Sequence, residues 1–469
     1  MLAPPVGAWL NVPPPYMKSG LLIGQDMDSG APVYIDEYGA RRDGRASSEV
    51  KVTGLKNFGK TAGMKWLAIV EMLLQAYSTR DELEEMRLHV DNNKPDESRV
   101  GTTSFAEWAN VIEELGCTVC PLEQMSLNIF DGTVYRTDYQ RLVTAVDMID
   151  FQDSTGLPND WKLAVRMAIA SIRVRGIADD KLRLQHLEYA LRHLCPADLK
   201  RFWQVHDQSN GLLATESDDG FDAQGAYGAL DEASRRNADG LQDAARAAAN
   251  KLMLIINGEY GATYAGRRQL SEYMKGSVLF DFSAASARAV EFFEMIRFSA
   301  LRSMVERGDQ SCIPHVSIRE EVQEGAAVNS LVLRARAYWN AKARMSHMQT
   351  YESTQYPASL LYGEPGSTAR FYAEQIFDGT DLFVMFRQND DPLTRAILAD
   401  RIRLTSHQIE RVMRLPTGCA LFKPKDEQGR FVQLDIVPSV KELIQSNRPV
   451  DRMVGNRQLV TDLLGTDRL

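Results

Sequence analysis

Apolar positions in the first third of the chain follow the strand period and the helix period in turn. The run Glu49-Val50-Lys51-Val52-Thr53 is typical of a short β-strand. Residues 62–77 then place apolar side chains at three- and four-residue steps, the period of a helix with one buried face: Trp66, Ile69, Val70, Leu73 and Leu74. Further strands are predicted at 87–91 and 117–122, with a helix at 105–115 between them. Because strands alternate with helices, the pattern predicts an α/β fold with a mainly parallel sheet flanked by helices.

The middle of the chain follows the helical period alone. Amphipathic stretches lie at 139–151, 160–173, 181–193, 199–206 and 244–254, and the polar interval 209–239 is predicted as a long exposed loop. Strands return at 278–282, 313–318 and 344–351, separated by helices at 285–307 and 326–338. We expect an N-terminal arm with two short strands around a turn (1–48), the first part of the sheet (49–137), an all-α insertion (138–256) and the second part of the sheet (257–469).

Composition narrows the class of protein without deciding it. The 469 residues are 44% hydrophobic and 25% charged, which is ordinary for a globular chain of two or three domains. No apolar run is long enough to span a bilayer and the first residues lack the features of a leader, so we expect a cytoplasmic protein. The net charge of −9 argues against a wholly basic nucleic-acid-binding surface but leaves a local basic channel open.

The cysteines do not indicate a disulfide framework. There are five in a long chain, which fits reduced thiols. Cys117 and Cys120 have the C-x-x-C spacing. Without a second such pair nearby, they are weak grounds for a zinc or redox site.

One segment between the strand at 49–53 and the helix at 62–77 carries a specific chemical signature. It matches the phosphate-binding pattern G-x-x-x-x-G-K-[ST] in full. Glycines let backbone N–H groups surround the phosphates, Lys60 reaches the β- and γ-phosphates, and Thr61 offers a hydroxyl to Mg²⁺. The predicted cofactors are ATP and Mg²⁺, held by Gly54, Leu55, Lys56, Asn57, Phe58, Gly59, Lys60, Thr61 and Ala62. The alternative is a Gly-rich turn in which Lys60 is merely solvated.

Polar residues at the ends of other predicted strands complete the expected site. Hydrolysis of ATP needs a carboxylate at a strand end to hold the Mg²⁺ shell, and Glu320 and Glu321 follow the strand at 313–318. Gln355, past the strand at 344–351, is the candidate sensor of the γ-phosphate. Asp91 closes its strand and is expected at the same edge of the sheet as the phosphate loop. The alternative for Glu320 and Glu321 is a charged, solvated strand end.

The order of short motifs resembles the ATPases of conjugation and type IV secretion, in the HerA and FtsK superfamily of P-loop motors. The resemblance rests on segments at 24–33, 54–61, 90–94, 126–131, 279–283, 353–355, 404–405 and 415–421. It covers most of the chain and implies a RecA-like P-loop NTPase core with an inserted all-α subdomain. It also implies a hexameric ring with ATP between subunits, in which an arginine of one subunit completes its neighbour's site. Arg336 and Arg344 are the leading candidates for that arginine, and a surface ion pair is the alternative for each.

Two departures from the family pattern affect the expected activity. Where the family usually reads Asp-Glu, this chain has Arg319-Glu320, or Glu320-Glu321 if the register slips by one residue. If Arg319 occupies the metal position, Mg²⁺ is held mainly by Thr61 and phosphate, and turnover is slow. The chain also begins almost at the ATPase domain, so we expect the channel-docking domain of many secretion ATPases to be missing or encoded separately.

The predicted function is an ATP-driven motor of a conjugation or secretion apparatus that moves protein or single-stranded DNA. Its expected partners are channel components, with the protein at the inner face of the membrane through them. One alternative is a DNA-pumping or coupling ATPase of the same superfamily. A second alternative, suggested by Arg319, is a scaffold that assembles with ATP but barely hydrolyses it.

Overall fold

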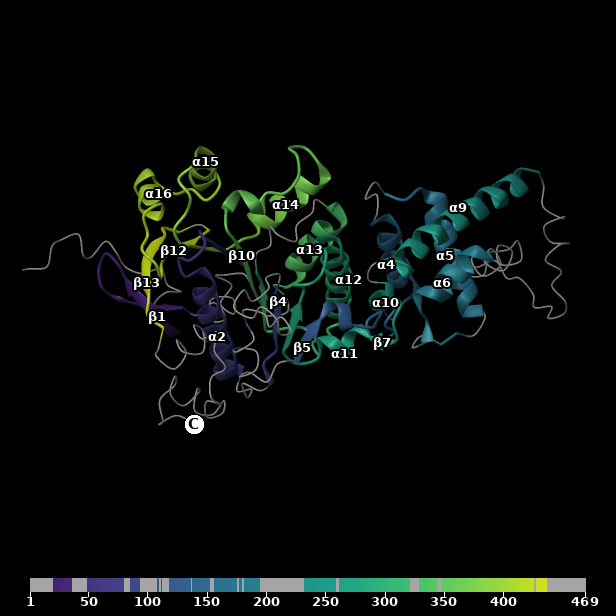
Figure 1. Cartoon of the computed structure of the whole chain (residues 1–469), viewed down its shortest axis with the longest axis horizontal. Coiled ribbons are helices and arrows are strands. Elements are labelled where there is room, and N and C mark those ends of the chain that lie inside the picture. Colours follow the sequence, from purple (N-terminus) through teal and green to yellow (C-terminus); the bar gives the residue numbers. More distant parts are fainter. Residues whose placement is uncertain are drawn as a thin grey trace, which may run out of the picture. The chain divides into compact units, whose positions relative to one another are not determined.

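The computed structural model describes residues 20–35, 49–79, 85–92, 108, 111, 118–135, 137–151, 156–174, 177–178, 181–194, 232–258, 261–320, 329–343, 348–425 and 427–436. The chain divides into two compact units. The first comprises Met1–Leu122, Met274–Glu291 and Met304–Leu469, and the second comprises Glu123–Tyr273 and Phe292–Ser303. Figure 1 labels their elements. Among the described helices, none combines the length and the apolar character that crossing a bilayer requires.

A single large sheet forms the centre of the first unit. The order of its described strands is β2-β1-β13-β12-β11-β3-β10-β9-β4-β8-β5. Strands from β11 to β5 in this order are parallel, and β12, β13, β1 and β2 extend the sheet in antiparallel fashion. The strand bounds are β1 Leu21–Asp26, β2 Pro32–Ile35, β3 Glu49–Thr53, β4 Leu88–Asn92, β5 Thr118–Pro121, β8 Val278–Asp281, β9 Val316–Arg319, β10 Gln349–Thr354, β11 Leu382–Met385, β12 Cys419–Pro424 and β13 Arg430–Leu434.

Helix α2 (Lys60–Thr79) packs its apolar side chains on one face of this sheet. Its buried residues join one core with Val50 and Val52 of β3, Ile318 of β9 and Val90 of β4. Since successive strand residues face opposite sides, the intervening residues of the same strands face away from α2. Those residues include several buried charges, which are described with the site below.

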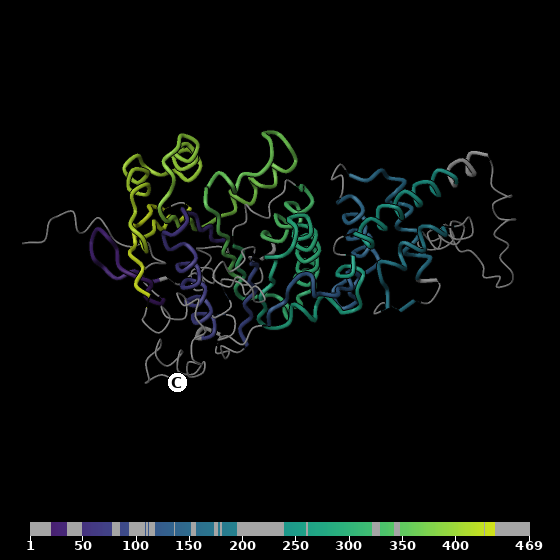
Figure 2. Tube along the Cα trace, viewed as in Figure 1, coloured from purple at the N-terminus to yellow at the C-terminus, as the bar shows by residue number. Residues whose placement is uncertain are grey.

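The remaining helices of the first unit are α12 Ala287–Val305, which also runs through the second unit, α13 Ser330–Ala343, α14 Thr368–Asp378, α15 Pro392–Asp400 and α16 Ser406–Val412. A 3₁₀ turn lies at Pro357–Leu360. Helices α13 and α14 pack together through Leu333, Ala369, Ala373 and Ile376. Figure 2 follows the chain path from purple at the N-terminus to yellow at the C-terminus. In the sheet, the early strand β3 pairs with β10 and β11, which come from the last third of the sequence.

The second unit is mainly helical. Its helices are α4 Asp138–Asp150, α5 Asn159–Val174, α6 Leu184–Arg192, α9 Glu232–Ile256 and α10 Gly261–Tyr264, and α11 Leu270–Met274 lies at its boundary with the first unit. Helix α9 packs on α5 and α6, and its Ala245, Ala248 and Leu252 are fully buried. Between 138 and 256 the described residues form helices and no strand, as the periodicity predicts.

A buried aspartate anchors the turn at 126–131, one of the segments that carry the family resemblance. Asp131 accepts hydrogen bonds from the backbone N–H of Ser271 at 2.9 Å and from its hydroxyl at 2.7 Å. It also accepts from the backbone N–H of Thr133 at 2.8 Å. Beside this turn, β6 (Leu127–Asn128) pairs with β7 (Arg268–Gln269). These bonds join the two ends of the helical segment within the second unit.

The C-terminal third differs most from the sequence-based expectation. Strand β10 begins at Gln349 and runs to Thr354, later than the predicted 344–351, and α13 begins at Ser330 instead of 326. Every residue of β10 is buried, and most of them are polar. The strand therefore lacks the alternation of apolar and polar residues by which a strand is predicted. Strands β11 and β13 and helices α14, α15 and α16 were not predicted from the sequence. The predicted helices at 105–115 and 199–206 lie mostly or wholly outside the described residues, as does most of the 209–239 interval.

Candidate functional site

The phosphate-loop sequence lies at a strand-to-helix junction. Strand β3 ends at Thr53, and α2 begins at Lys60. Gly59 (φ 95°) and Asn57 (φ 70°) adopt left-handed backbone conformations, which glycine and asparagine tolerate best. Gly54 has φ 156°, and a Cβ placed there would lie 2.6 Å from the Cβ of Phe386. The first glycine of the pattern is therefore required by close packing, and the second by its backbone conformation.

Neighbouring segments hold this loop through backbone hydrogen bonds. Leu55 N–H donates to the carbonyl of Arg387 at 2.9 Å, and Gly54 N–H donates to the carbonyl of Thr354 at 3.3 Å. On the other side, Gly418 N–H donates to the carbonyl of Phe58 at 3.2 Å. The guanidinium of Arg387 also lies 4.9 Å from the centre of the Phe58 ring. The loop is thus fixed by the last residue of β10, by a residue that follows β11 and by the turn before β12.

The side chains of the loop differ in exposure. Lys60 is buried, and Thr61 and Ala62 are half-buried at the start of α2. Lys56 and Asn57 are exposed at the tip. The first helical turn closes with Gly63 N–H donating to the carbonyl of Gly59 at 2.8 Å. The N–H groups of the first turn of an α-helix have no partner within the helix, so this turn provides donors and a favourable dipole for an anion.

The predicted polar residues lie at the same edge of the sheet as the loop. Thr354 pairs with Thr53 in register, and Gln355 follows immediately. Glu320 follows β9, is buried, and donates its backbone N–H to the carbonyl of Asp91 at 3.2 Å. Strand β10 lies between β3 and β9. The carboxyl ends of parallel strands form the usual ligand edge of such sheets, and the loop, Gln355, Glu320 and Asp91 share it.

Arg319 stands where the family pattern has the first residue of Asp-Glu, which raised the expectation that it occupies the metal position. In the structure its guanidinium contacts two buried carboxylates. Its Nη1 lies 2.9 Å from Oε1 of Glu352 on β10, and its Nε lies 3.5 Å from Oδ2 of Asp91 on β4. The three residues stand at the same level of adjacent strands, because Arg319 pairs in register with both Glu352 and Asp91. The guanidinium is therefore engaged within the sheet face opposite α2.

These pairs belong to a larger buried group, which we call the charge cluster and which comprises Glu49, Lys51, Asp91, Arg319, Arg336 and Glu352. Lys51 forms ion pairs with Glu49 and Glu352, and Arg336 of α13 forms an ion pair with Glu352. Asn340 donates its side-chain N–H to Glu49 at 2.6 Å. The cluster holds three acidic and three basic side chains, so its charges balance.

The pKa values of the two glutamates reflect their different positions in the charge cluster. Burial alone would raise the pKa of Glu352, but Arg336, Lys51 and Arg319 outweigh it and hold that pKa well below its usual range. Burial raises the pKa of Glu49, which Lys51 offsets only in part. Burial also raises the pKa of nearby Tyr362 to about 12. Glu352 is accordingly the anionic centre of the cluster.

The remaining sequence-predicted residues fall into two groups. Arg336 is buried in the charge cluster, and service as a finger for a neighbouring subunit requires it to leave Glu352. Glu321, Arg344 and Cys117 lie outside the described residues, and Cys120 is buried. Among the residues that the structure describes, no group of three or more His, Cys, Asp or Glu side chains is arranged to hold a metal ion. The roles assigned from the sequence to these residues and to the phosphate loop stay predictions.

Sequence reasoning did not single out Glu352, the residue that contacts the most members of the charge cluster. It lies within Gln349–Thr354, where charged and hydroxyl residues obscure the strand. Single charged residues within apolar strand-like runs could have indicated a buried cluster of charges. Lys51 lies in Val50-Lys51-Val52, and Arg319 follows Ile318. Charges that are buried in central strands need partners of opposite sign on neighbouring strands.

The chain is similar to known proteins in its fold, whereas its sequence matches none of the families or curated proteins compared. No protein-family model matches the chain, and no curated protein matches it. Among solved structures, VirB4 of Thermoanaerobacter pseudethanolicus matches with a TM-score of 0.58 at 14% sequence identity, over 90% of this chain and 98% of that protein. The chain has the fold of VirB4. At the level of the fold, this match confirms the predicted α/β class with a mainly parallel sheet flanked by helices, and it agrees with the resemblance drawn from the sequence motifs.

Two structures of the plasmid coupling protein TrwB also match beside VirB4. The complex with the ATP analogue ADPNP has 13% identity and a TM-score of 0.49, over 91% of this chain and 95% of that one. The complex with ADP and Mg²⁺ has 15% identity and a TM-score of 0.47, over 91% and 96%. Both scores are below 0.5, so the assignment of the fold rests on VirB4.

Proposed function

We propose that this protein binds and hydrolyses ATP as the motor of a conjugation or type IV secretion apparatus. The observation that carries the proposal is the complete phosphate-loop pattern at the β3–α2 junction of a chain with the VirB4 fold. The loop conformation supports it, because Gly54 and Gly59 keep the backbone open where a side chain would interfere. The residues present therefore fit a nucleotide and its Mg²⁺.

In this proposal different residues at the sheet edge bind the phosphates, bind Mg²⁺ and orient the reacting groups. Backbone N–H groups of the loop and the ammonium of Lys60 hold the phosphates. Thr61 and Glu320 would hold Mg²⁺, which neutralises charge on the phosphates when it is bound. Gln355 orients the water or the γ-phosphate by hydrogen bonding. Arg319 does not compete for the metal in this arrangement, because Glu352 and Asp91 engage its guanidinium.

The direct test is the rate of ATP hydrolysis by the wild type and by Lys60→Ala. Loss of the lysine that contacts the β- and γ-phosphates should reduce turnover by about 100-fold or more, as removal of a preorganised charge at a reacting phosphate does. Lys56→Ala is the matched control, since the proposal uses Lys56 only through its backbone N–H and its side chain is exposed. Equal turnover in the wild type and in Lys60→Ala would overturn the proposal.

A DNA-pumping or coupling ATPase is the nearest alternative. It predicts that single- or double-stranded DNA stimulates hydrolysis and that the stimulation falls steeply with salt, because phosphate contacts release counterions. A secretion motor acting on protein predicts turnover that DNA does not change. The ATP-binding scaffold predicts nucleotide-dependent assembly with turnover as low as that of Lys60→Ala.

Assembly and location follow from the same proposal. We infer a hexameric ring in which ATP lies between subunits and channel components position the ring at the inner face of the membrane. Sedimentation of the wild type with and without ATP and Mg²⁺ tests the ring. Arg344→Ala and Arg336→Ala test the two candidate fingers: the true finger is the one whose loss reduces turnover while ATP affinity and folding are kept.

A further inference from the structure

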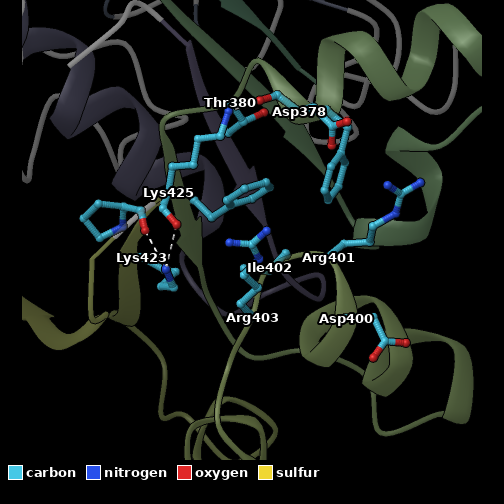
Figure 3. Close-up of a pocket in the computed structure, with 11 residues that line it drawn as sticks. Asp378, Thr380, Asp400, Arg401, Ile402, Arg403, Lys423 and Lys425 are labelled. Carbon is cyan, nitrogen blue, oxygen red and sulfur yellow. Dashed lines mark hydrogen bonds between the residues drawn. The ribbon is translucent and has the colours of Figure 1, made fainter. Parts of the chain in front are cut away.

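A polar pocket lies at the opposite edge of the sheet from the phosphate loop. Its volume is about 380 Å³, and it is formed by residues 377–383, 400–403 and 423–425 (Figure 3). At one end of β11, Met385 pairs with Thr53 beside the loop, whereas at the other end Leu382 pairs with Val50. The pocket adjoins that second end, since Thr380 lies two residues before the strand and lines the pocket. It is therefore separate from the proposed ATP site.

Basic side chains outnumber acidic ones in this pocket by four to two. Two of them make hydrogen bonds to neutral carbonyl groups. The ammonium of Lys423 donates to the carbonyls of Pro424 at 2.6 Å and Glu427 at 2.7 Å, and that of Lys425 donates to the carbonyl of Asp378. Carbonyls orient an ammonium group without cancelling its charge. These bonds fix the two lysines as positive groups on one side of the pocket.

Arg403 enters the same pocket from a conformation that non-glycine residues rarely adopt. Its φ is 61°, and its side chain is exposed. In the described part of the chain no carboxylate pairs with its guanidinium, whereas neighbouring Arg401 lies 2.6 Å from Glu374. Figure 3 shows Arg403 extending into the space beside Lys423, with Asp400 on the outer side of the pocket. The strained backbone thus directs an unpaired cation into a cavity that already holds positive charge.

We propose that this pocket binds a small phosphate-bearing ligand. A phosphoryl group carries close to two negative charges and offers several acceptor oxygens, which suit the planar fork of Arg403 together with Lys425. A single carboxylate would satisfy Arg403 alone and leave Lys425 uncompensated. The apolar floor, which includes Phe383 and Ile402, accommodates the body of a ligand beyond its phosphate.

The test uses inorganic pyrophosphate and the full-length chain, and it removes Lys60 so that the phosphate loop does not dominate binding. Titration calorimetry on Lys60→Ala should show a pyrophosphate site, and adding Arg403→Gln should weaken it about ten-fold or more, as loss of a charged hydrogen bond does. The control is Lys60→Ala with Arg414→Gln, which removes an arginine whose side chain is 82% exposed. This control should bind pyrophosphate like Lys60→Ala.

Three outcomes would overturn the proposal: no pyrophosphate binding by Lys60→Ala, binding unaffected by Arg403→Gln, or equal weakening by Arg414→Gln. Thermal unfolding of each variant shows whether it is folded. Arg403→Gly is a second variant that removes the guanidinium at a backbone conformation that glycine adopts readily, so it should fold and still lose the site. Failure here is distinguishable from failure of the proposed motor, because ATP hydrolysis by the wild type does not depend on this pocket.

Discussion

Arg319 Nη1 lies 2.9 Å from Oε1 of Glu352, and both side chains are buried on adjacent central strands. This pair explains how a strand end that the family resemblance expects to read Asp-Glu tolerates an arginine. Lys51 and Arg336 contact the same glutamate, and Asp91 contacts the same arginine. The arginine at this position is a member of a balanced buried cluster, and Glu320 is left as the carboxylate at the end of β9.

We predict that Arg319→Met lowers the free energy of unfolding by about 3–5 kcal/mol, because it leaves Glu352 and Asp91 buried with one cation fewer. Urea unfolding followed by circular dichroism measures this change. Arg414→Met, at an exposed arginine, is the control and should change stability by less than about 0.5 kcal/mol. Similar stability of both variants would show that the pair is not important to the fold.

The charge cluster also predicts how stability depends on pH. The folded-state pKa of Glu352 is lowered from its usual 4.5. The contribution of Glu352 to the free energy of unfolding is therefore complete above pH 4.5 and is lost as the pH falls below that value. The folded-state pKa of Glu49 is raised. The contribution of Glu49 to the free energy of unfolding is therefore complete below pH 4.5 and is lost as the pH rises through that folded-state pKa. We predict that acid lowers the urea midpoint of the wild type more than that of Glu352→Gln.

The measurement compares urea midpoints at about pH 7 and about pH 3.5, on either side of the glutamate range. Only the change with pH is compared, because Glu352→Gln also removes a partner of Arg319 and Arg336. Glu364→Gln, at an exposed glutamate, is the control and should retain the wild-type change. A wild-type change that persists in Glu352→Gln would refute this account of Glu352.

Substitution of Gly54 should damage the phosphate loop itself. An added Cβ would lie 2.6 Å from that of Phe386, so Gly54→Ala forces a backbone shift and should cost about 2 kcal/mol or more. Gly30→Ala is the control: Gly30 has φ 69° but nothing within 4 Å, and it should cost about 1 kcal/mol from its conformation alone. Binding of a fluorescent ATP analogue should be lost in Gly54→Ala and kept in Gly30→Ala.

The backbone strain at Arg403 gives a prediction about stability that does not involve any ligand. Arg403→Gly removes a left-handed conformation that costs a non-glycine residue about 1–2 kcal/mol, offset by the entropy that glycine loses on folding. Thermal unfolding should therefore show no loss of stability. Arg401→Gly, at φ −98°, should lose about 1 kcal/mol. A large loss in Arg403→Gly would mean that its side chain stabilises the fold.

The sequence predicted those parts of the fold that have strong local periodicity. The strand at 49–53, helix α2, and the strand and helix at 278–307 are found within a few residues of the predicted bounds. Strand β11 is a four-residue apolar run, too short for a period to distinguish strand from helix. The phosphate loop was predictable because its chemistry fixes residue types at fixed spacing.

The charge cluster was not predictable, because its contacts join distant parts of the chain. Lys51 and Glu352 are separated by 301 residues, and Arg319 and Glu352 by 33. From the sequence alone, Arg319 was therefore interpreted as standing in the position of a metal ligand. Only the register of β9, β10 and β4 shows which carboxylates engage its guanidinium.

The central claim is that this chain hydrolyses ATP with Glu320 as the working carboxylate beside the phosphate loop. The most direct test is ATP turnover by Glu320→Gln at saturating ATP and Mg²⁺, measured together with ATP affinity. The account predicts that binding is kept while turnover falls by about 100-fold or more. Wild-type turnover by Glu320→Gln would contradict it.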